Sequence, residues 1–269
     1  MVKVAVVGVA GRMGKVISSC IVDSPDTEPG GGTEMAGHPA LGQDLGEVAG
    51  LGKNGQVILE DLSTVLDGAD VVIDFSTPDS SMKTLDAVVA KGKAVVFGTT
   101  GFSEDQKAKI KKASETTRIV LAPNMSIGVN VLFKIAGDVA RILGNNYDVE
   151  IVEAHHKFKK DAPSGTAVRL SEVIADALDR NLKEVGVYGR HGFSEGRTVE
   201  EIGVHTVRAG DIVGEHRVIF GGMGETLELF HKAQSRDTFA RGAVHAAAWL
   251  VNQKPGLYDM QDVLGLREK

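Results

Sequence analysis

Hydrophobic residues in the first half of the chain form short runs that alternate with amphipathic segments. Four runs have the length and the continuous apolar character of buried strands: residues 2–7, 70–75, 93–97 and 118–122. Three intervening segments carry apolar residues at helical spacing: residues 15–22, 78–91 and 103–116. Nearly continuous apolar strands separated by helices favour a parallel sheet that is covered on both faces. We therefore predict an α/β first domain.

Two stretches interrupt this alternation. Glu28–Gly32 contains Pro-Gly-Gly-Gly, residues that disfavour a strand interior, so no clear second strand is predicted there. Residues 37–54 are rich in glycine and are predicted to form a loop. By contrast, Ser103 followed by Gln106 is typical of a helix N-terminus, since each side chain can bond a backbone N–H of the other.

The pattern changes after Asn124. Three long segments have helical character: residues 127–143, 165–178 and 237–251. Between them, four runs are rich in β-formers: residues 149–153, 199–207, 215–220 and 226–230. The last three runs are separated by glycine turns, which indicates an antiparallel or mixed sheet. We predict a second, α+β domain that begins near residue 126.

Composition and charge exclude several classes of function. The 269 residues are 42% hydrophobic and 25% charged, as in ordinary globular proteins, and the net charge of −6 does not suggest a nucleic-acid or anionic-membrane partner. No apolar run approaches the ~18 residues that a membrane-spanning helix needs. Cys20 is the only cysteine, so an intrachain disulfide is impossible and a cytoplasmic location is expected.

A glycine-rich segment follows the first predicted strand and opens the first helix. Gly8, Gly11 and Gly14 are spaced three apart, with Ala10 where the usual dinucleotide-binding motif has its second glycine. Such a site needs glycine for the tight turn, for the approach of a pyrophosphate to the backbone, and for close packing of helix on strand. The helix N-terminus then faces the anion.

An acidic residue at the expected distance supports this interpretation. Glu34 lies 20 residues after Gly14, where dinucleotide sites place a carboxylate that accepts hydrogen bonds from the adenosine ribose. Met35 follows, where an arginine would be expected to bind a 2′-phosphate. We therefore expect NADH to be preferred and NADPH to be possible, with Lys15 or His38 as residues that could weaken the preference. The alternative is a structural turn beside a surface glutamate.

Residues 153–166 hold the most informative cluster of charge. Two histidines and three lysines occur within six residues of an acidic protein, directly after an apolar strand. Pro163 and Ser164 then open a helix, with Ser164 as the N-cap, so the N–H groups of Gly165 and Thr166 would be open to an anion. Cationic groups and a helix N-terminus in one place suit a small dicarboxylate. The alternative is that the charged residues form a solvent-exposed face without a function.

Metal binding is the less favoured explanation of this cluster. Adjacent histidines on a strand point to opposite faces, so His155 and His156 would not easily share an ion, and no spacing of Cys or carboxylate residues completes a tetrahedral set. No metal site is therefore predicted. Four other histidines lack a comparable setting and are expected to be surface or internally satisfied residues: His191, His205, His216 and His231.

At these residues the sequence resembles the 4-hydroxy-tetrahydrodipicolinate reductase (dihydrodipicolinate reductase) family. Five segments spread over nearly the whole chain carry the resemblance: residues 7–14, 97–101, 122–130, 153–166 and 207–216. The most specific is Glu153-Ala-His-His, followed by Lys159-Lys-Asp-Ala-Pro-Ser-Gly-Thr166. The resemblance implies a Rossmann-like dinucleotide-binding domain (1–126 with 237–269). It also implies a second domain (127–236) that binds substrate and whose sheet builds a homotetramer.

The resemblance also implies roles for individual residues. His155 and Lys159 would be the catalytic pair, and His156, Gly165 and Thr166 would bind the substrate. The cofactor would be lined by residues from four segments: Gly8, Val9, Ala10, Gly11, Arg12, Met13, Glu34, Gly98, Thr99, Thr100, Ala122, Pro123, Asn124 and Met125. The implied reaction reduces a cyclic imine dicarboxylate in lysine and diaminopimelate synthesis, with hydride delivered to ring C4 and a proton to C3. A histidine that titrates near neutrality suits the proton transfer, and a lysine suits the developing charge.

Two other functions remain compatible with these residues. Another NAD-dependent dehydrogenase could use the same nucleotide domain, because a fold alone does not fix a function. A non-catalytic dinucleotide-binding redox sensor would bind NADH without needing His155, Lys159 or the anion site beside them.

Overall fold

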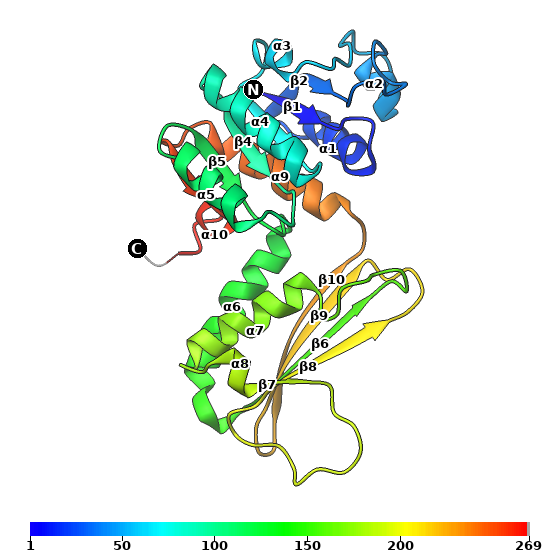
Figure 1. Ribbon diagram of the computed structural model, residues 1–269. Coiled ribbons are helices and arrows are strands. Elements are labelled where there is room, and N and C mark those ends of the chain that lie inside the picture. Colours follow the sequence, from blue (N-terminus) through cyan, green and yellow to red (C-terminus); the bar gives the residue numbers. More distant parts are fainter. Residues whose placement is uncertain (268–269) are drawn as a thin grey trace. The chain divides into compact units, whose positions relative to one another are not determined.

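The computed structural model describes residues 1–267, which fold into two compact units. Unit 1 comprises Met1–Ile127 and the chain from Arg236 onward, and unit 2 comprises Gly128–Ser235. The chain therefore returns to its first unit after the second, as the colour sequence in Figure 1 shows.

Unit 1 is built on a six-stranded, entirely parallel sheet in the order β11-β5-β4-β3-β1-β2. Its strands are β1 Val2–Val7, β2 Thr27–Thr33, β3 Val71–Asp74, β4 Ala94–Phe97, β5 Arg118–Leu121 and β11 Gly256–Tyr258. Its helices are α1 Arg12–Asp23, α2 Leu45–Ala49, α3 Leu62–Leu66, α4 Pro78–Lys91, α5 Glu104–Ala113, α9 Asp237–Leu250 and α10 Met260–Val263. Apolar side chains of α1 and α9 pack on one face of the sheet, and those of α4 and α5 pack on the other.

The glycine-rich residues near position 30 form a strand, contrary to the sequence-based expectation. β2 pairs in parallel with β1 at the edge of the sheet, and the register shifts so that Gly30 has no partner on β1 and Ala5 pairs with Gly31, which has a φ of 113°. Space is also limited, because a Cβ at Gly32 would lie 2.8 Å from the Leu45 Cδ1 and 3.0 Å from the Val9 Cβ. An edge strand also tolerates Pro29. Close packing here outweighs the low β-propensity of the segment.

The stretch predicted as a loop (37–54) is only partly irregular. Within it α2 forms a short helix whose N-cap, Asp44, accepts a hydrogen bond from the backbone N–H of Glu47, and Gly50 ends the helix in the left-handed conformation. Elsewhere the capping prediction is confirmed, since Ser103 and Gln106 make the reciprocal capping box at the start of α5.

Unit 2 contains a five-stranded mixed sheet in the order β10-β9-β6-β8-β7, drawn in green, yellow and orange in Figure 1. Its strands are β6 Asp148–His155, β7 Gly186–Tyr188, β8 Ile202–Arg208, β9 Gly214–Gly221 and β10 Thr226–Ala233. Its helices are α6 Ile127–Leu143, the 3-10 helix η1 Gly144–Asn146, α7 Gly165–Ala177 and α8 Leu182–Val185. β6 pairs in parallel with β8 and antiparallel with β9, so the predicted mixed sheet is confirmed.

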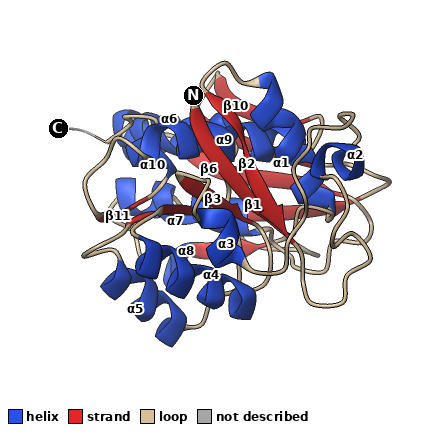
Figure 2. Ribbon diagram, turned by 90° about the horizontal axis from the view of Figure 1, so that it is seen from above, coloured by secondary structure: helices blue, strands red, loops and turns tan. Residues whose placement is uncertain are grey.

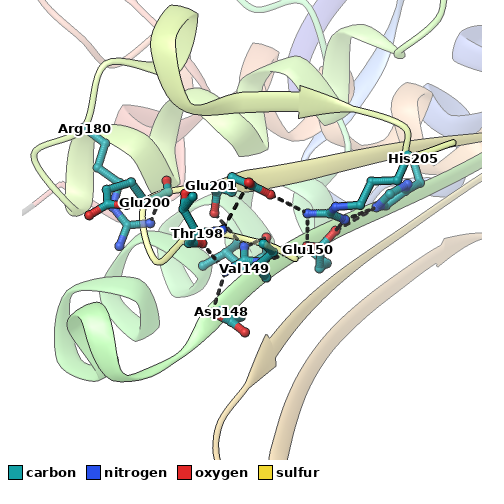
Figure 3. Close-up of polar contacts among 10 residues, drawn as sticks. Asp148, Val149, Glu150, Arg180, Thr198, Glu200, Glu201 and His205 are labelled. Atoms are coloured by element: carbon teal, nitrogen blue, oxygen red, sulfur yellow. Dashed lines mark hydrogen bonds and ion pairs between the residues drawn. The ribbon is translucent and has the colours of Figure 1, made fainter. Parts of the chain in front are cut away.

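Alternate residues of β6 point to opposite faces of the unit 2 sheet. Val149 and Ile151 join the core with buried residues of α6 and α7, while Glu150 lies on the other face. The strand predicted over 199–207 begins later, at Ile202, because Arg197 and Glu201 belong to a loop that is fixed by ion pairs and hydrogen bonds. Figure 3 shows this loop packed against the start of β6.

The predicted fold class is confirmed: a parallel Rossmann-like sheet is followed by an α+β unit with a mixed sheet. Figure 2 distinguishes the helices and the strands by colour. Within residues 1–267, no helix combines the length and the apolar character that crossing a membrane requires.

Candidate active site

The glycine-rich turn between β1 and α1 has the geometry that close contact with an anion requires. Gly8 has a φ of 70°, a conformation that favours glycine. A Cβ at Gly14 would lie 2.2 Å from the Gly8 carbonyl oxygen and 2.6 Å from the Val9 Cα, so only glycine lets α1 pack this closely. Gly11 is the N-cap of α1 and supplies no side-chain cap, and it is exposed together with Arg12. The helix start is therefore open to a ligand.

Glu34 lies beside this turn because it follows β2, the neighbour of β1. Its Oε1 accepts a hydrogen bond from the backbone N–H of Ala10 (2.8 Å), and its Oε2 accepts one from the N–H of Met35 (3.3 Å). The structure thus brings together the acidic residue and the glycine-rich turn, which are 24 residues apart. Met13 is half-buried, and Val9 is fully buried, so Val9 can offer a ligand only its backbone.

Two further segments of the predicted cofactor site follow β4 and β5. The carboxyl ends of parallel strands lie at one edge of a sheet, so Gly98–Thr100 and Ala122–Met125 share the edge that carries the glycine-rich turn. Thr99 is buried and its hydroxyl is bonded to Ser81 and to the Asp74 carbonyl, whereas Thr100 and Pro123 are exposed. The side chains of Ala122 and Met125 are buried, and Asn124 accepts the N–H of Ser126.

A buried carboxylate organises the end of β6 in unit 2. Glu153 has no exposed side-chain surface, and its Oε2 lies 2.6 Å from the Nδ1 of His155, two residues further along. Arg208, opposite His155 on β8, donates to both oxygens at 2.8 and 2.9 Å. Burial alone would raise the pKa of the Glu153 carboxyl, but the hydrogen bonds from His155 and Arg208 outweigh it and hold that pKa well below its ordinary value. Glu153 is therefore an anion at neutral pH.

The start of α7 is tied to the same carboxylate. The backbone N–H of Ser164 donates to Glu153 Oε1 (2.9 Å), while the Ser164 hydroxyl caps the helix by accepting the N–H of Ala167 (3.2 Å). The predicted N-cap is thus confirmed. Gly165 is exposed, and a Cβ there would meet nothing within 4 Å, so open space adjoins the first turn of the helix. Thr166 follows in that turn and is half-buried.

Lys159 and His156 lie in the loop between His155 and α7. The Lys159 side chain is only 21% exposed and its ammonium pairs with Asp161 at 2.9 Å, while the backbone N–H of Lys159 bonds the carbonyl of His156. The His156 ring is half-buried, and its Nδ1 is buried without a hydrogen-bond partner among the described residues. A lysine, two histidines and a helix start therefore converge on one end of the unit 2 sheet.

The expectation that His216 is a surface or internally satisfied histidine is wrong. It is only 3% exposed on β9, its ring centroid lies 5.2 Å from that of His155, and its Nε2 is 3.1 Å from the Ser164 hydroxyl. Its Nδ1 is buried without a partner, and burial, reinforced by the charge of His155, lowers the pKa of His216 to about 3. The alternation along β9 would have indicated this burial, because His216 shares a face with Val218 and Phe220.

Sequence reasoning also missed Glu153 and Arg208 as parts of the site. They are 55 residues apart and meet only because β6 and β8 pair in register. Across residues 1–267, no group of three or more His, Cys, Asp or Glu side chains is arranged to hold a metal ion.

Comparison with known proteins identifies the family. The model of the dihydrodipicolinate reductase N-terminus matches residues 2–125, and the model of its C-terminus matches residues 128–264. The chain belongs to the dihydrodipicolinate reductase family. It is 53% identical to the 4-hydroxy-tetrahydrodipicolinate reductase of Hahella chejuensis over 99% of this chain and 100% of that protein. The enzyme of the same name from Geobacter metallireducens is 55% identical, with the same coverage.

Solved structures agree with this family and fold. A dipicolinate-bound dihydrodipicolinate reductase from Paenisporosarcina sp. TG-14 has a TM-score of 0.76 at 26% identity, covering 97% of this chain and 98% of that one. An amine dehydrogenase from Mycobacterium smegmatis shares the fold, with a TM-score of 0.59 at 14% identity, covering 100% and 97%. The predicted family and its class of activity, NAD(P)H-dependent reduction, are therefore confirmed.

Proposed function

We propose that this dihydrodipicolinate reductase converts 4-hydroxy-tetrahydrodipicolinate, NADH and a proton into tetrahydrodipicolinate, NAD⁺ and water. The observation that carries the proposal is the constellation in unit 2: a histidine held by a buried carboxylate, a half-buried lysine, and a helix start beside open space. A planar dicarboxylate would satisfy both the cations and the helix N-terminus.

The nucleotide-binding role falls to residues 1–126 with 237–269. The residues fit a dinucleotide, since Gly8 and Gly14 allow the tight turn and close packing of α1, and Gly11 at the N-cap leaves the start of α1 uncapped by any side chain. Bound NADH supplies a hydride. Glu34 would accept the adenosine ribose hydroxyls while Thr100 and Pro123 border the same edge of the sheet. A carboxylate followed by Met35 disfavours a 2′-phosphate, so NADH is preferred and NADPH remains usable.

The substrate-binding role falls to residues 127–236. Gly165 and Thr166 would orient one carboxylate with backbone N–H groups at the start of α7, and His156 would bind the same dicarboxylate. His155 would give its proton to ring C3, and Lys159 would stabilise the negative charge that hydride arrival drives toward the ring nitrogen. The pairing of Lys159 with Asp161 keeps the ammonium close to the start of α7 until substrate binds.

A coupled assay tests this function. Aspartate semialdehyde and pyruvate, condensed by a synthase, supply the substrate, and NADH oxidation is followed by absorbance. The wild type should consume NADH only when both precursors are present. His155→Asn and Lys159→Ala should each lower kcat by about 10²–10⁴ while sparing NADH affinity. Lys160→Ala, which removes an exposed neighbouring lysine, is the matched control and should retain activity. NADH binding without oxidation would instead indicate a sensor.

Assembly as a homotetramer and action in the cytoplasm belong to the same proposal. The face of the unit 2 sheet opposite α6 and α7 exposes Val207 and Phe230 at 43% and 50%, which is apolar area that a second copy could cover. The only cysteine is unpaired, as a reducing compartment allows. Light scattering coupled to size-exclusion chromatography should give four times the chain mass, and a stable monomer at working concentration would refute the assembly.

A further inference from the structure

Glu153 makes contact with both halves of the proposed site. Its Oε2 binds the His155 ring, its Oε1 binds the N–H of Ser164 at the start of α7, and Arg208 binds both oxygens. The Thr206 hydroxyl adds a fifth contact, to Oε1, at 3.3 Å. A carboxylate so fully satisfied and without exposed surface has little freedom to move. It can therefore fix the positions of the groups that bind it.

The charge of Glu153 determines which ring nitrogen of His155 carries the proton. An ionised carboxylate only accepts hydrogen bonds, so the nitrogen 2.6 Å from it, Nδ1, must be protonated. In the neutral ring Nε2 is then the basic atom, and in the charged ring it carries the proton that can be transferred. Within residues 1–267, no hydrogen bond is made to the Nε2 of His155. A Cβ added at Gly214 would lie 3.1 Å from this nitrogen. Glycine at 214 keeps that side of the ring clear.

We infer that Glu153 is a positioning residue, which presents Nε2 of His155 as the proton-transferring atom and ties that ring to the carboxylate-binding start of α7. The inference rests on the proposed function for the identity of the substrate. Arg208 acts through Glu153, because its fork holds both carboxylate oxygens while its Nη2 also bonds the carbonyl of Asp161. The loop that carries Lys159 is thereby connected to the same anion.

Other titratable groups near His155 lie on β8, β9 and β10 and in the loop that follows His155. His216 faces it from β9, and the His231 beyond, on β10, has its pKa lowered by burial, so both are uncharged at neutral pH. Arg208 lies opposite on β8, and Lys159 with Asp161 lies in the following loop. Arg208 and Lys159 are the cations near this ring, and Glu153 is the anion in direct contact with it. Removing the charge of Glu153 should therefore cause kcat to fall at a lower pH than in the wild type.

The test compares Glu153→Gln with Glu150→Gln, a matched control on the same strand. Glu150 is also bound by a histidine and an arginine, since His205 lies 2.7 Å away and Arg190 donates to both of its oxygens (Figure 3). It points to the opposite face of the sheet, away from His155. Each variant removes one negative charge, buried at Glu153 and half-buried at Glu150, so both variants should be less stable than the wild type. Only the change at Glu153 should alter proton transfer.

Steady-state kinetics give the first measurement. Glu153→Gln should lower kcat by about 10- to 100-fold, the usual cost of misplacing a catalytic group, and leave the Kd for NADH unchanged. In the profile of kcat against pH, the limb on the alkaline side should move to lower pH in Glu153→Gln. In Glu153→Asp, which keeps the charge, this limb should lie closer to its wild-type position. Glu150→Gln should keep the wild-type limb. If the limb stays in place in Glu153→Gln while stability falls as in Glu150→Gln, the role is structural and the inference is overturned.

Nuclear magnetic resonance of the histidine ring nitrogens gives a measurement that does not depend on turnover. In ¹⁵N-histidine-labelled wild type, the signal that disappears in His155→Asn should show a protonated Nδ1 and an unprotonated Nε2 at a pH where the ring is neutral. Glu153→Gln should lose this preference. A wild-type ring protonated at Nε2 would overturn the inference even if Glu153→Gln does not fold. If the wild type binds NADH but does not reduce the substrate, the proposed function is wrong. The spectrum still tests the role of Glu153 in that case.

Discussion

Replacing Gly14 by alanine perturbs the proposed nucleotide-binding turn in unit 1 and leaves the proposed substrate-binding residues of unit 2 unchanged. A Cβ at this position would lie 2.2 Å from the Gly8 carbonyl oxygen, 2.6 Å from the Val9 Cα and 2.7 Å from the Val9 carbonyl carbon. Ordinary contact begins at 3.4 Å, so α1 must move by about 1 Å from the glycine-rich turn. The atoms in the way belong to the backbone, which cannot rotate aside as a flexible side chain can.

The expected magnitudes follow from this displacement. Overpacking of this kind costs about 1–3 kcal/mol, and the better helix propensity of alanine returns at most about 1 kcal/mol. Thermal unfolding should therefore occur a few degrees lower. Moving the helix start also weakens its contacts with a bound pyrophosphate. The loss of one hydrogen bond to a charged group, about 1.5–3 kcal/mol, raises the Kd for NADH by roughly 10- to 100-fold.

Isothermal titration with NADH, paired with thermal unfolding, measures both effects. The control is Gly165→Ala, a glycine at the start of a helix in the other unit, where an added Cβ meets nothing within 4 Å. This variant should unfold and bind NADH as the wild type does. If Gly14→Ala matches the wild type in both measurements, the close packing at Gly14 has no bearing on nucleotide binding, contrary to this prediction.

Three further predictions concern the substrate, the cofactor and pH. Gly165→Ala should raise the KM for the dicarboxylate by about tenfold, because its methyl group occupies space proposed for a carboxylate; an unchanged KM would place the substrate elsewhere. Wild-type kcat/KM should favour NADH over NADPH, and Glu34→Gln should reduce that ratio by about tenfold as the repulsion of the 2′-phosphate is lost; a tenfold advantage for NADPH in the wild type would contradict this. Hydrogen bonds from Arg190 and His205 outweigh burial and lower the pKa of Glu150 from 4.5 to about 2, so its ion pairs stabilise the fold above pH 4.5 and this contribution disappears as pH falls toward 2. The Tm difference between the wild type and Glu150→Gln should therefore shrink over that range, and a constant difference would argue against the ion pairs.

Elements with a strong local pattern were predicted well from the sequence. β1, β3, β4 and β5 are mostly apolar because helices cover both faces of the sheet, so their composition alone distinguishes them. The capping box at Ser103 and the N-cap at Ser164 depend only on residues within four positions, and both are present. Interactions of this range leave a readable signal.

The remaining features depend on contacts between distant residues. β2 forms although its glycines disfavour a strand, because it pairs along β1 and fits against Leu45. Glu153 meets Arg208 across 55 residues, and His216 meets Ser164 across 52, so no local spacing reveals either pair. The cationic cluster was found because His155, Lys159 and Gly165 are close in sequence. The sequence analysis did not identify Glu153 as the anion that organises this cluster, because the groups that bind Glu153 come from three segments: β6, the start of α7 and β8.

Transfer of deuterium from the cofactor to the product tests the proposed hydride transfer. NADH deuterated at the transferable position of nicotinamide C4 is incubated with the wild type and with substrate generated from aspartate semialdehyde and pyruvate. Direct hydride transfer to the ring predicts one deuterium per molecule of tetrahydrodipicolinate, at ring C4, and incorporation slower by about a hundredfold or more with His155→Asn. Product without deuterium, or bound NADH that is never oxidised, would contradict it.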